Sequence, residues 1–479
     1  MANVSPARYV SYGFARTHQV LVAGMSGDAM EIWVGDKTPT HALAELSRTL
    51  NLRLVTVRKA DDELTSAISR AYSQQEGSAA AVVDEVESDL DLSRLMQDIP
   101  KIEDLLETED DAPIIRMINA LLTQASRDGA SDIHIEPFES YSVVRFRVDG
   151  TLRDVVRPRR ELHAALVSRI KILAQLDIAE KRLPQDGRIA LRIGGRPIDV
   201  RVSTLPTGHG ERAVLRLLDK EAGRLDLSKL GMSSATLVNF DKLVHQPHGI
   251  VLVTGPTGSG KTTTLYAALS RLDASTTNIL TVEDPIEYDL EGVGQTQVNA
   301  KIDMTFSKAL RSILRQDPDV IMIGEIRDLE TAQIAVQASL TGHLVLATLH
   351  TNDAVSAITR LIDMGIEPFL LSSSLLGVVG QRLVRKLCPQ CRQPDPLSKG
   401  WRAVGCLACN RTGFQGRSGI YELLAIDDDI RGFIHRNAPE GEVRVNAVRK
   451  GMMSMREDGQ RWVQAGVSSL EEVIRVTRD

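Results

Sequence analysis

Hydrophobic and polar residues follow a different pattern in each of three parts of the chain. The first 72 residues alternate strand-like pieces (20–23, 30–34) with helical spacing (38–50, 61–72). This mixture predicts a small N-terminal α/β domain over 1–72.

The second part, 112–220, has one helical stretch, 114–126, followed by long two-residue alternation. The segments YSVVRFRVDG (141–150) and GRIALRIGGRPIDVRVSTLP (187–206) alternate as paired strands do, with Gly194 and Gly195 as a tight turn. The pattern therefore predicts an α+β domain over 112–220, and a short linker up to residue 230 separates it from the third part.

The third part, 231–479, contains continuous apolar strands at 249–254, 278–282 and 319–324. The first strand runs directly into a glycine-rich loop, and a helix-forming stretch follows that loop. Strand, loop and helix in this order predict an α/β domain with a phosphate-binding loop.

Between the first two domains, small polar residues (73–81) precede a strongly acidic run. From Asp84 to Asp111 there are 12 Asp/Glu against Arg94 and Lys101, a local charge of −10 in a chain of net charge −6. Like-charge repulsion and low apolar content predict a flexible linker over 73–111, with a solvated acidic helix as the alternative for part of it.

The opposite charge gathers between Arg145 and Lys220, where 17 Lys/Arg face 9 Asp/Glu, a balance of +8. Such a segment either meets phosphates, acidic partners or lipid headgroups, or is a solvated arginine-rich surface. Aromatic residues make up only 4% of the chain, which weakens any function based on stacking nucleic-acid bases.

No apolar run approaches the roughly 20 residues that cross a bilayer. The best candidate, 369–380, is short and holds three serines, and the N-terminus lacks the apolar core of a signal peptide. We therefore expect a cytoplasmic protein that reaches a membrane only through partners.

The loop GPTGSGKT fits G-x-x-x-x-G-K-[ST] at every position. Glycines let backbone N–H groups wrap the phosphates, the lysine reaches the β- and γ-phosphates, and the final threonine hydroxyl binds Mg²⁺. The predicted ATP site comprises Gly255, Pro256, Thr257, Gly258, Ser259, Gly260, Lys261, Thr262 and Thr263, with Thr262 as the Mg²⁺ ligand.

Carboxylates follow the other two apolar strands. Glu325 and Asp328 follow 319–324, where P-loop proteins place an acid that holds Mg²⁺ or its waters. Glu283, Asp284 and Glu287 follow 278–282, where a carboxylate can polarise the attacking water. His343 and His350 flank a further short apolar strand, which favours a site role over a structural one.

All four cysteines form two C-x-x-C pairs: Cys388 with Cys391, and Cys406 with Cys409. Reduced thiolates at this spacing predict a structural zinc site, with Zn²⁺ clamping a module at about 383–423. One alternative is that the cysteines form disulfides. A more specific alternative is a nucleic-acid-binding zinc finger, which nearby basic residues such as Arg382 and Arg392 keep open.

Taken in order, these motifs resemble the secretion ATPase superfamily, most closely the type II secretion ATPase, with the type IV pilus assembly ATPases as near relatives. The matching pieces run from about 130 to 421, and include ASDIHIEP, RFRVDGTLRD, IAEKRLPQDGRI, VSTLPTGHGERAVLRLLD, TVEDPIEYDLEGVGQTQVN, ALRSILRQDPDVIMIGEIRD and TAQIAVQASLTGHLVLATLHTNDA. The resemblance implies a PAS-like domain before a RecA-like P-loop domain.

The resemblance also implies roles for single residues. Glu283 is similar to the glutamate that activates water, Glu325 to the Walker B acid, and His343 and His350 to the histidines near the γ-phosphate. Arg201 and Arg216 match arginines that move onto the γ-phosphate as their domain closes, and Arg311 and Arg315 match arginines at or near a subunit boundary.

The expected function is that of a cytoplasmic, homo-hexameric ATPase that drives pseudopilus assembly and type II secretion, with ATP, Mg²⁺ and Zn²⁺ as cofactors. Its expected partners are an inner-membrane assembly protein that docks residues 1–72, an inner-membrane platform protein and an acidic phospholipid surface, with no nucleic acid. A pilus assembly ATPase, a nucleic-acid-linked P-loop protein and a nucleotide-gated scaffold remain as alternatives.

Overall fold

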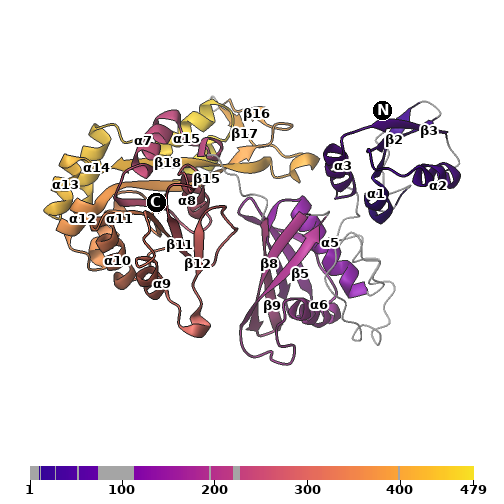
Figure 1. The fold of residues 1–479 in the computed structure, drawn as a ribbon, viewed down its shortest axis with the longest axis horizontal. Coiled ribbons are helices and arrows are strands. Elements are labelled where there is room, and N and C mark those ends of the chain that lie inside the picture. Colours follow the sequence, from indigo (N-terminus) through magenta and orange to yellow (C-terminus); the bar gives the residue numbers. More distant parts are fainter. Residues whose placement is uncertain are drawn as a thin grey trace. The chain divides into compact units, whose positions relative to one another are not determined.

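The computed structural model describes residues 10, 12–26, 29–50, 53–73, 113–193, 196–219, 227–396 and 400–478. The chain divides into two compact units, Met1–Glu221 and Ala222–Asp479, and Figure 1 labels many of their helices and strands. Most of the predicted acidic linker, and the Gly194–Gly195 turn, lie outside the described residues. None of the helices in these described ranges combines the length and apolar character that crossing a bilayer requires.

The N-terminal part of the first unit is a three-stranded sheet packed against helices. Strands β1 and β2 form an antiparallel hairpin and β3 pairs with β2 in parallel. The core is formed by alternate strand residues such as Val20, Val22, Met30 and Ile32. The elements are α1 (Tyr12–His18), β1 (Val20–Ser26), β2 (Ala29–Val34), α2 (Thr40–Leu50), β3 (Arg53–Arg58) and α3 (Asp61–Ser73).

The rest of the first unit is a six-stranded antiparallel sheet in the order β6-β5-β4-β9-β8-β7. One face packs on α5 and α6 through residues such as Ile133, Phe146, Val200 and Leu215, as the α+β prediction requires. The elements are α5 (Pro113–Arg127), β4 (Ala130–Pro137), β5 (Ser142–Val148), β6 (Thr151–Val156), α6 (Arg160–Leu173), β7 (Gln185–Ile193), β8 (Arg196–Thr207) and β9 (Gly210–Asp219).

The second unit is built on a seven-stranded sheet in the order β12-β11-β13-β14-β10-β15-β18. All neighbouring strands are parallel except the edge pair β15 and β18. Its strands are β10 (Gly249–Thr254), β11 (Ile279–Glu283), β12 (Gly294–Gln297), β13 (Val320–Ile323), β14 (Leu344–Leu349), β15 (Leu375–Leu387) and β18 (Phe414–Ala425).

Both faces of the central part of this sheet are buried, which explains why β10, β13 and β14 are almost continuously apolar. Along β10, Ile250 and Leu252 face a core formed with α9 to α14, whereas Val251 and Val253 face a core formed with α7 and α8. These helices are α7 (Ser234–Val244), α8 (Lys261–Leu269), α9 (Phe306–Ile313), α10 (Leu329–Leu340), α11 (Ser356–Asp363), α12 (Pro368–Ser374), α13 (Asp428–His435) and α14 (Glu440–Arg449).

The C-terminal helices α15 (Met455–Gln464) and α16 (Leu470–Val476) pack on the extended β15–β18 hairpin through residues such as Val384, Ile420 and Val473. The loop of this hairpin carries the four cysteines and the short strands β16 (Gln393–Pro394) and β17 (Trp401–Arg402). Short 3-10 helices lie at Leu227–Leu230, Ala300–Ile302 and Leu407–Cys409. The predicted zinc module is thus an outgrowth of the central sheet.

Candidate nucleotide and metal sites

The glycine-rich loop joins β10 to α8, and its backbone requires glycine at Gly255. That residue has φ +152°, and a Cβ there would lie 2.3 Å from the carbonyl oxygen of Gln381. Gly260, with φ +88°, is the N-cap of α8. The loop therefore bends sharply enough to aim the first N–H groups of a nine-residue helix at one point.

Lys261 is folded back over this loop. Its Nζ donates to the carbonyl oxygens of Gly255 and Pro256, at 2.9 and 3.1 Å, and burial lowers its pKa. The Ser259 hydroxyl is buried without a hydrogen-bond partner among the described residues. A buried cation and an orphaned donor beside glycine backbone fit a nucleotide phosphate, and Thr262, the predicted Mg²⁺ ligand, lies in the first turn of α8.

Gln381 of β15 braces the loop, a role that the sequence motifs do not indicate. Its side chain is 2% exposed, donates to the Ser259 carbonyl at 2.8 Å and accepts from Thr264 Oγ1 at 2.7 Å. The sequence does carry one signal for this role, because Gln381 is a polar residue within the apolar run of β15.

Glu325, just after β13, lies beside His350. Its carboxylate pairs with Arg327, and its Oε2 lies 3.3 Å from His350 Nε2. Burial first, and then the positive charge of Lys261, lower the pKa of His350. The carboxylate also interacts electrostatically with Lys261, so an acid and a neutral imidazole lie in contact at the carboxyl end of the sheet, within electrostatic range of the loop lysine.

Asp328 has a different role from Glu325. Its Oδ1 accepts the Thr331 N–H at 2.8 Å, so it is the N-cap of α10. Asp284 lies 3.5 Å from Arg327 Nη1. Of the two acids predicted after this strand, Asp328 is thus engaged in capping α10, and Glu325 lies beside His350.

Glu283, the last residue of β11, is 2% exposed. Its Oε1 accepts from Thr281 Oγ1 at 2.6 Å and Gln295 Nε2 at 3.0 Å, and its Oε2 accepts from the Tyr266 hydroxyl. Three donors, from β11, β12 and α8, therefore hold both oxygens of this carboxylate.

His343 lies at the other end of β14 from His350. Its Nδ1 lies 2.8 Å from the Ala338 carbonyl of α10, and its own carbonyl accepts the Gly249 N–H where β10 begins. A six-residue strand is about 20 Å long. The expected place of His343 near the γ-phosphate is therefore not supported within one chain.

Arg311 and Arg315 lie exposed on and just after α9. Arg311 pairs with Glu330 of α10, and Arg315 Nη1 donates to the Arg311 carbonyl at 2.9 Å. The structure does not bring either side chain to the loop, and their boundary role stays a prediction.

Arg201 and Arg216 are directly opposite each other on β8 and β9, on the sheet face away from α5 and α6. Arg216 also lies opposite Asp132 of β4, and its Nε donates to Asp132 Oδ1 at 2.8 Å. Asp132 is 4% exposed, whereas the Arg216 side chain is 57% exposed. Part of the basic character of the 145–220 segment is thus tied to buried carboxylates.

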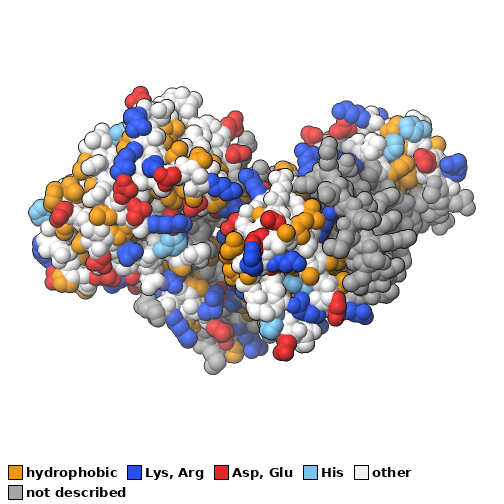
Figure 2. All heavy atoms as spheres, turned by 90° about the horizontal axis from the view of Figure 1, so that it is seen from below, with side chains coloured by type: hydrophobic (Ala, Val, Ile, Leu, Met, Phe, Trp, Pro, Cys, Tyr) orange, Lys and Arg blue, Asp and Glu red, His pale blue; other side chains and the backbone are white. Residues whose placement is uncertain are grey.

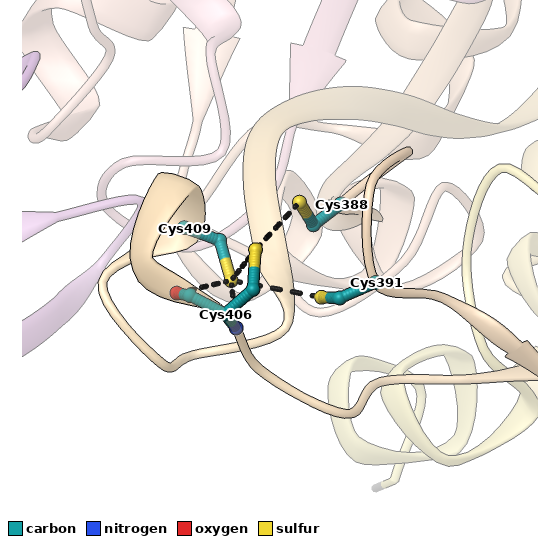
Figure 3. Close-up of side chains that lie close together, drawn as sticks. All are labelled: Cys388, Cys391, Cys406 and Cys409. Carbon is teal, nitrogen blue, oxygen red and sulfur yellow. Dashed lines mark hydrogen bonds between the residues drawn. The ribbon is translucent and has the colours of Figure 1, made fainter.

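The four cysteine sulfurs form one cluster (Figure 3). The Sγ atoms of Cys388 and Cys406 lie 3.9 Å apart, those of Cys391 and Cys409 3.8 Å, and all four lie within 4.8 Å of one another. Zinc–sulfur bonds of about 2.3 Å in a tetrahedron place sulfurs about 3.8 Å apart. The cluster therefore fits Zn²⁺.

Backbone N–H groups surround this cluster. Gly405 N donates to Cys391 Sγ, and Cys406 N and Gly413 N donate to Cys409 Sγ, at 3.2 to 3.3 Å. Burial raises the pKa of Cys409, but the N–H donors of Cys406 and Gly413, together with the neighbouring thiols, outweigh it and bring the pKa to about 6, whereas burial raises the pKa of Cys391 to about 11. Cys409 is thus the thiol most readily ionised for a metal, and four protein sulfurs leave no open ligand position for a substrate.

A mainly parallel sheet covered on both faces, a glycine loop leading into a helix, and an acid at the end of the second strand from that loop define a RecA-like P-loop nucleotide-binding protein. The family described as "Type II/IV secretion system protein" matches residues 107–475, and the chain belongs to that family. A second family model, which describes an N-terminal domain of "GSPII protein E", matches residues 9–72.

Comparison with individual proteins agrees with this family assignment. The chain is 67% identical to the type II secretion system protein HxcR of Pseudomonas aeruginosa, over 98% of this chain and 99% of that one. It is 56% identical to the type II secretion system ATPase E of Vibrio cholerae, over 92% and 90%. Among solved structures, the pilus retraction motor PilT with bound ADP matches at TM-score 0.53 and 28% identity, covering 75% of this chain and 96% of that one.

Proposed function

We propose that this protein is a Mg²⁺-dependent ATPase that hydrolyses ATP to ADP and phosphate to drive pseudopilus assembly and type II secretion. The observation that carries the proposal is the Glu325–His350 contact at the carboxyl end of the sheet, with the lysine of the glycine loop, Lys261, within electrostatic range of both side chains. Phosphoryl transfer needs developing negative charge neutralised and a water held in line, and these residues supply a cation, a metal ligand and a neutral imidazole.

Each site residue then has a proposed role. The residues of 255–263 hold the phosphates, and Mg²⁺, when bound, neutralises charge on them. Thr262 and Glu325 hold that ion and its waters, and Glu283 accepts the proton of the attacking water. Arg201 and Arg216 are proposed to reach the γ-phosphate by movement of their domain, and Zn²⁺ on the four cysteines is proposed to be structural.

The proposed assembly is a homo-hexamer in the cytoplasm, with Arg311 and Arg315 at or near the subunit boundary. We propose that domain 1–72 docks an inner-membrane assembly protein, and that a platform protein and acidic phospholipid complete the contacts. The 67% identity to a type II secretion protein supports the secretion system over the pilus system. On the face drawn in Figure 2, basic and acidic side chains of the described residues are interspersed, unlike the basic track that nucleic acids follow.

The test compares two acids three residues apart. Glu325→Gln should bind ATP normally but lose about 10²- to 10³-fold in kcat, because its loss removes the metal and water ligand. Asp328→Asn should remain close to wild type, because asparagine also caps helices. ATP binding and phosphate release are measured for both, with and without the membrane partners and acidic vesicles.

If Asp328→Asn lost hydrolysis and Glu325→Gln did not, the role of metal and water ligand would pass to Asp328. Tight ATP binding with no hydrolysis by the wild type under every condition would make the protein a nucleotide-gated scaffold instead.

A further inference from the structure

Helix α8 carries a tyrosine whose hydroxyl holds the proposed catalytic base. Tyr266 is 1% exposed and donates to Glu283 Oε2. Burial first, and then the bond to Glu283, raise the pKa of Tyr266 far above its ordinary value. The hydroxyl therefore keeps its proton and remains a donor to the carboxylate.

The surroundings fix this hydroxyl as well as the carboxylate. Tyr266 Oη accepts the Glu287 N–H and Gln295 Nε2, both at 3.3 Å. Gln295 is held in turn, because its Nε2 donates to the Tyr288 carbonyl at 3.2 Å and its Oε1 accepts the Leu290 N–H at 2.7 Å. The Tyr266 ring packs edge-on against Tyr288, with centroids 4.7 Å apart. The network thus joins α8, β11, β12 and the segment between these two strands.

The same helix begins at the phosphate loop. Lys261 is its first residue and Tyr266 lies five residues later, about 7.5 Å along the axis. Tyr266 therefore lies too far along α8 to take part in the phosphate site that Lys261 and Thr262 form at the start of the helix. One rigid element presents the phosphate-binding residues at its start and the Glu283 donor in its second turn.

We infer that Tyr266 is a positioning residue of the ATPase reaction, which acts by fixing the Glu283 carboxylate through α8. The inference rests on the proposed function, in which Glu283 takes a proton from water. As it does so, the water oxygen bonds to the γ-phosphorus and the bond from that phosphorus to the bridging oxygen of ADP breaks. Thr281 supports the same carboxylate from its own strand.

Tyr266→Phe removes only the hydroxyl. We expect kcat to fall on the order of tenfold, the value of one hydrogen bond to a charged group, while KM for ATP stays unchanged because Lys261 and the loop remain intact. Thr281→Val, which removes a donor to the other Glu283 oxygen, should give the same split between kcat and KM.

Tyr288→Phe is the matched control. It removes a hydroxyl from the ring packed against Tyr266 but leaves all three donors to Glu283 in place, and should behave as wild type. Thermal unfolding of each variant shows whether it is folded, and the Thr281 variant tests the idea independently if the Tyr266 variant does not fold.

A double-variant cycle separates positioning from a general structural effect. If Tyr266 acts through Glu283, adding Tyr266→Phe to Glu283→Gln should cause no further loss in single-turnover hydrolysis. The inference would be overturned if kcat were unchanged in Tyr266→Phe while Glu283→Gln was impaired. It would also be overturned if Tyr266→Phe caused its full loss again in the double variant. Full activity in Glu283→Gln would instead overturn the role of Glu283 in the proposed function.

Discussion

Glu472 of α16 holds the C-terminal helix onto β15, just before the first cysteine of the cluster. It is 1% exposed, and two arginines donate to both of its oxygens: Arg385 through Nε at 3.0 Å and Nη2 at 2.7 Å, and Arg475 through Nε and Nη2, both at 2.7 Å. The Arg385 backbone N–H adds a further bond at 3.1 Å. We predict that Glu472→Gln weakens this attachment more than any exposed charge change on the same helix.

The magnitude follows from the protonation equilibrium. Burial raises the pKa of Glu472, but the bonds from Arg475 and Arg385 outweigh it and bring the pKa from 4.5 to about 2. One unit corresponds to about 1.4 kcal/mol, so the ionised form is favoured in the fold by ~3 kcal/mol. Because the folded pKa lies below the unfolded one, this stabilisation is complete well above pH 4.5 and is lost as the pH falls towards 2.

Hydrogen exchange of the amides of α16 and β15 measures the effect locally, which suits a chain of more than one unit. At pH 7, Glu472→Gln should lose about 100-fold in protection, the equivalent of ~3 kcal/mol. Glu471→Gln, an exposed neighbour on the same helix, should lose almost none. When exchange rates are normalised to the intrinsic rates, the difference in protection between Glu472→Gln and Glu471→Gln should become smaller at about pH 3. Equal protection at neutral pH, or a gap that does not change with pH, would refute the reasoning.

Two further predictions concern the metal and the histidines. Elemental analysis should find one zinc per chain, and Cys391→Ser should lose it and lower the unfolding temperature while leaving ATP binding intact; a metal-free, equally stable wild type would contradict the zinc assignment. His350→Gln should lower kcat on the order of tenfold, the value of one hydrogen bond to a charged group, through its contact with Glu325, whereas His343→Gln should leave the hydrolysis of a monomeric preparation unchanged. An equal loss in both would show that His343 reaches the nucleotide.

Several elements could be predicted because one strong local pattern dictates each of them. The glycine loop needs positive φ at fixed positions, and the cysteine pairs need metal-ligand spacing, so both patterns survive in the bare sequence. In the N-terminal domain the expected strands appear as β1 and β2, and the expected helices as α2 and α3. Strand β3 was not predicted, because its residues are mostly exposed on both faces and no two-residue alternation marks it.

The site residues that were not predicted depend on contacts between distant segments. Gln381 braces the loop from more than 100 residues away, and Gln295 and Tyr266 enclose Glu283 from different elements. Asp328 and Glu325 are equivalent acids in the sequence, and only the start of α10 distinguishes the cap from the ligand. The sequence places two histidines at the ends of one strand, but only the parallel register of β10 and β14 shows which end faces the loop.

The strand order gives a physical reason for the position of each acid. Neighbouring strands lie about 4.8 Å apart, and from β10 the sheet continues through β14 and β13 to β11. His350 therefore ends the strand next to the loop, Glu325 the second, and Glu283 the third, about 14 Å across the sheet. A carboxylate that far from β10 needs an element that crosses the intervening strands. Helix α8, which connects β10 to β11 over the face it shares with α7, is that element, and Tyr266 is where it meets Glu283.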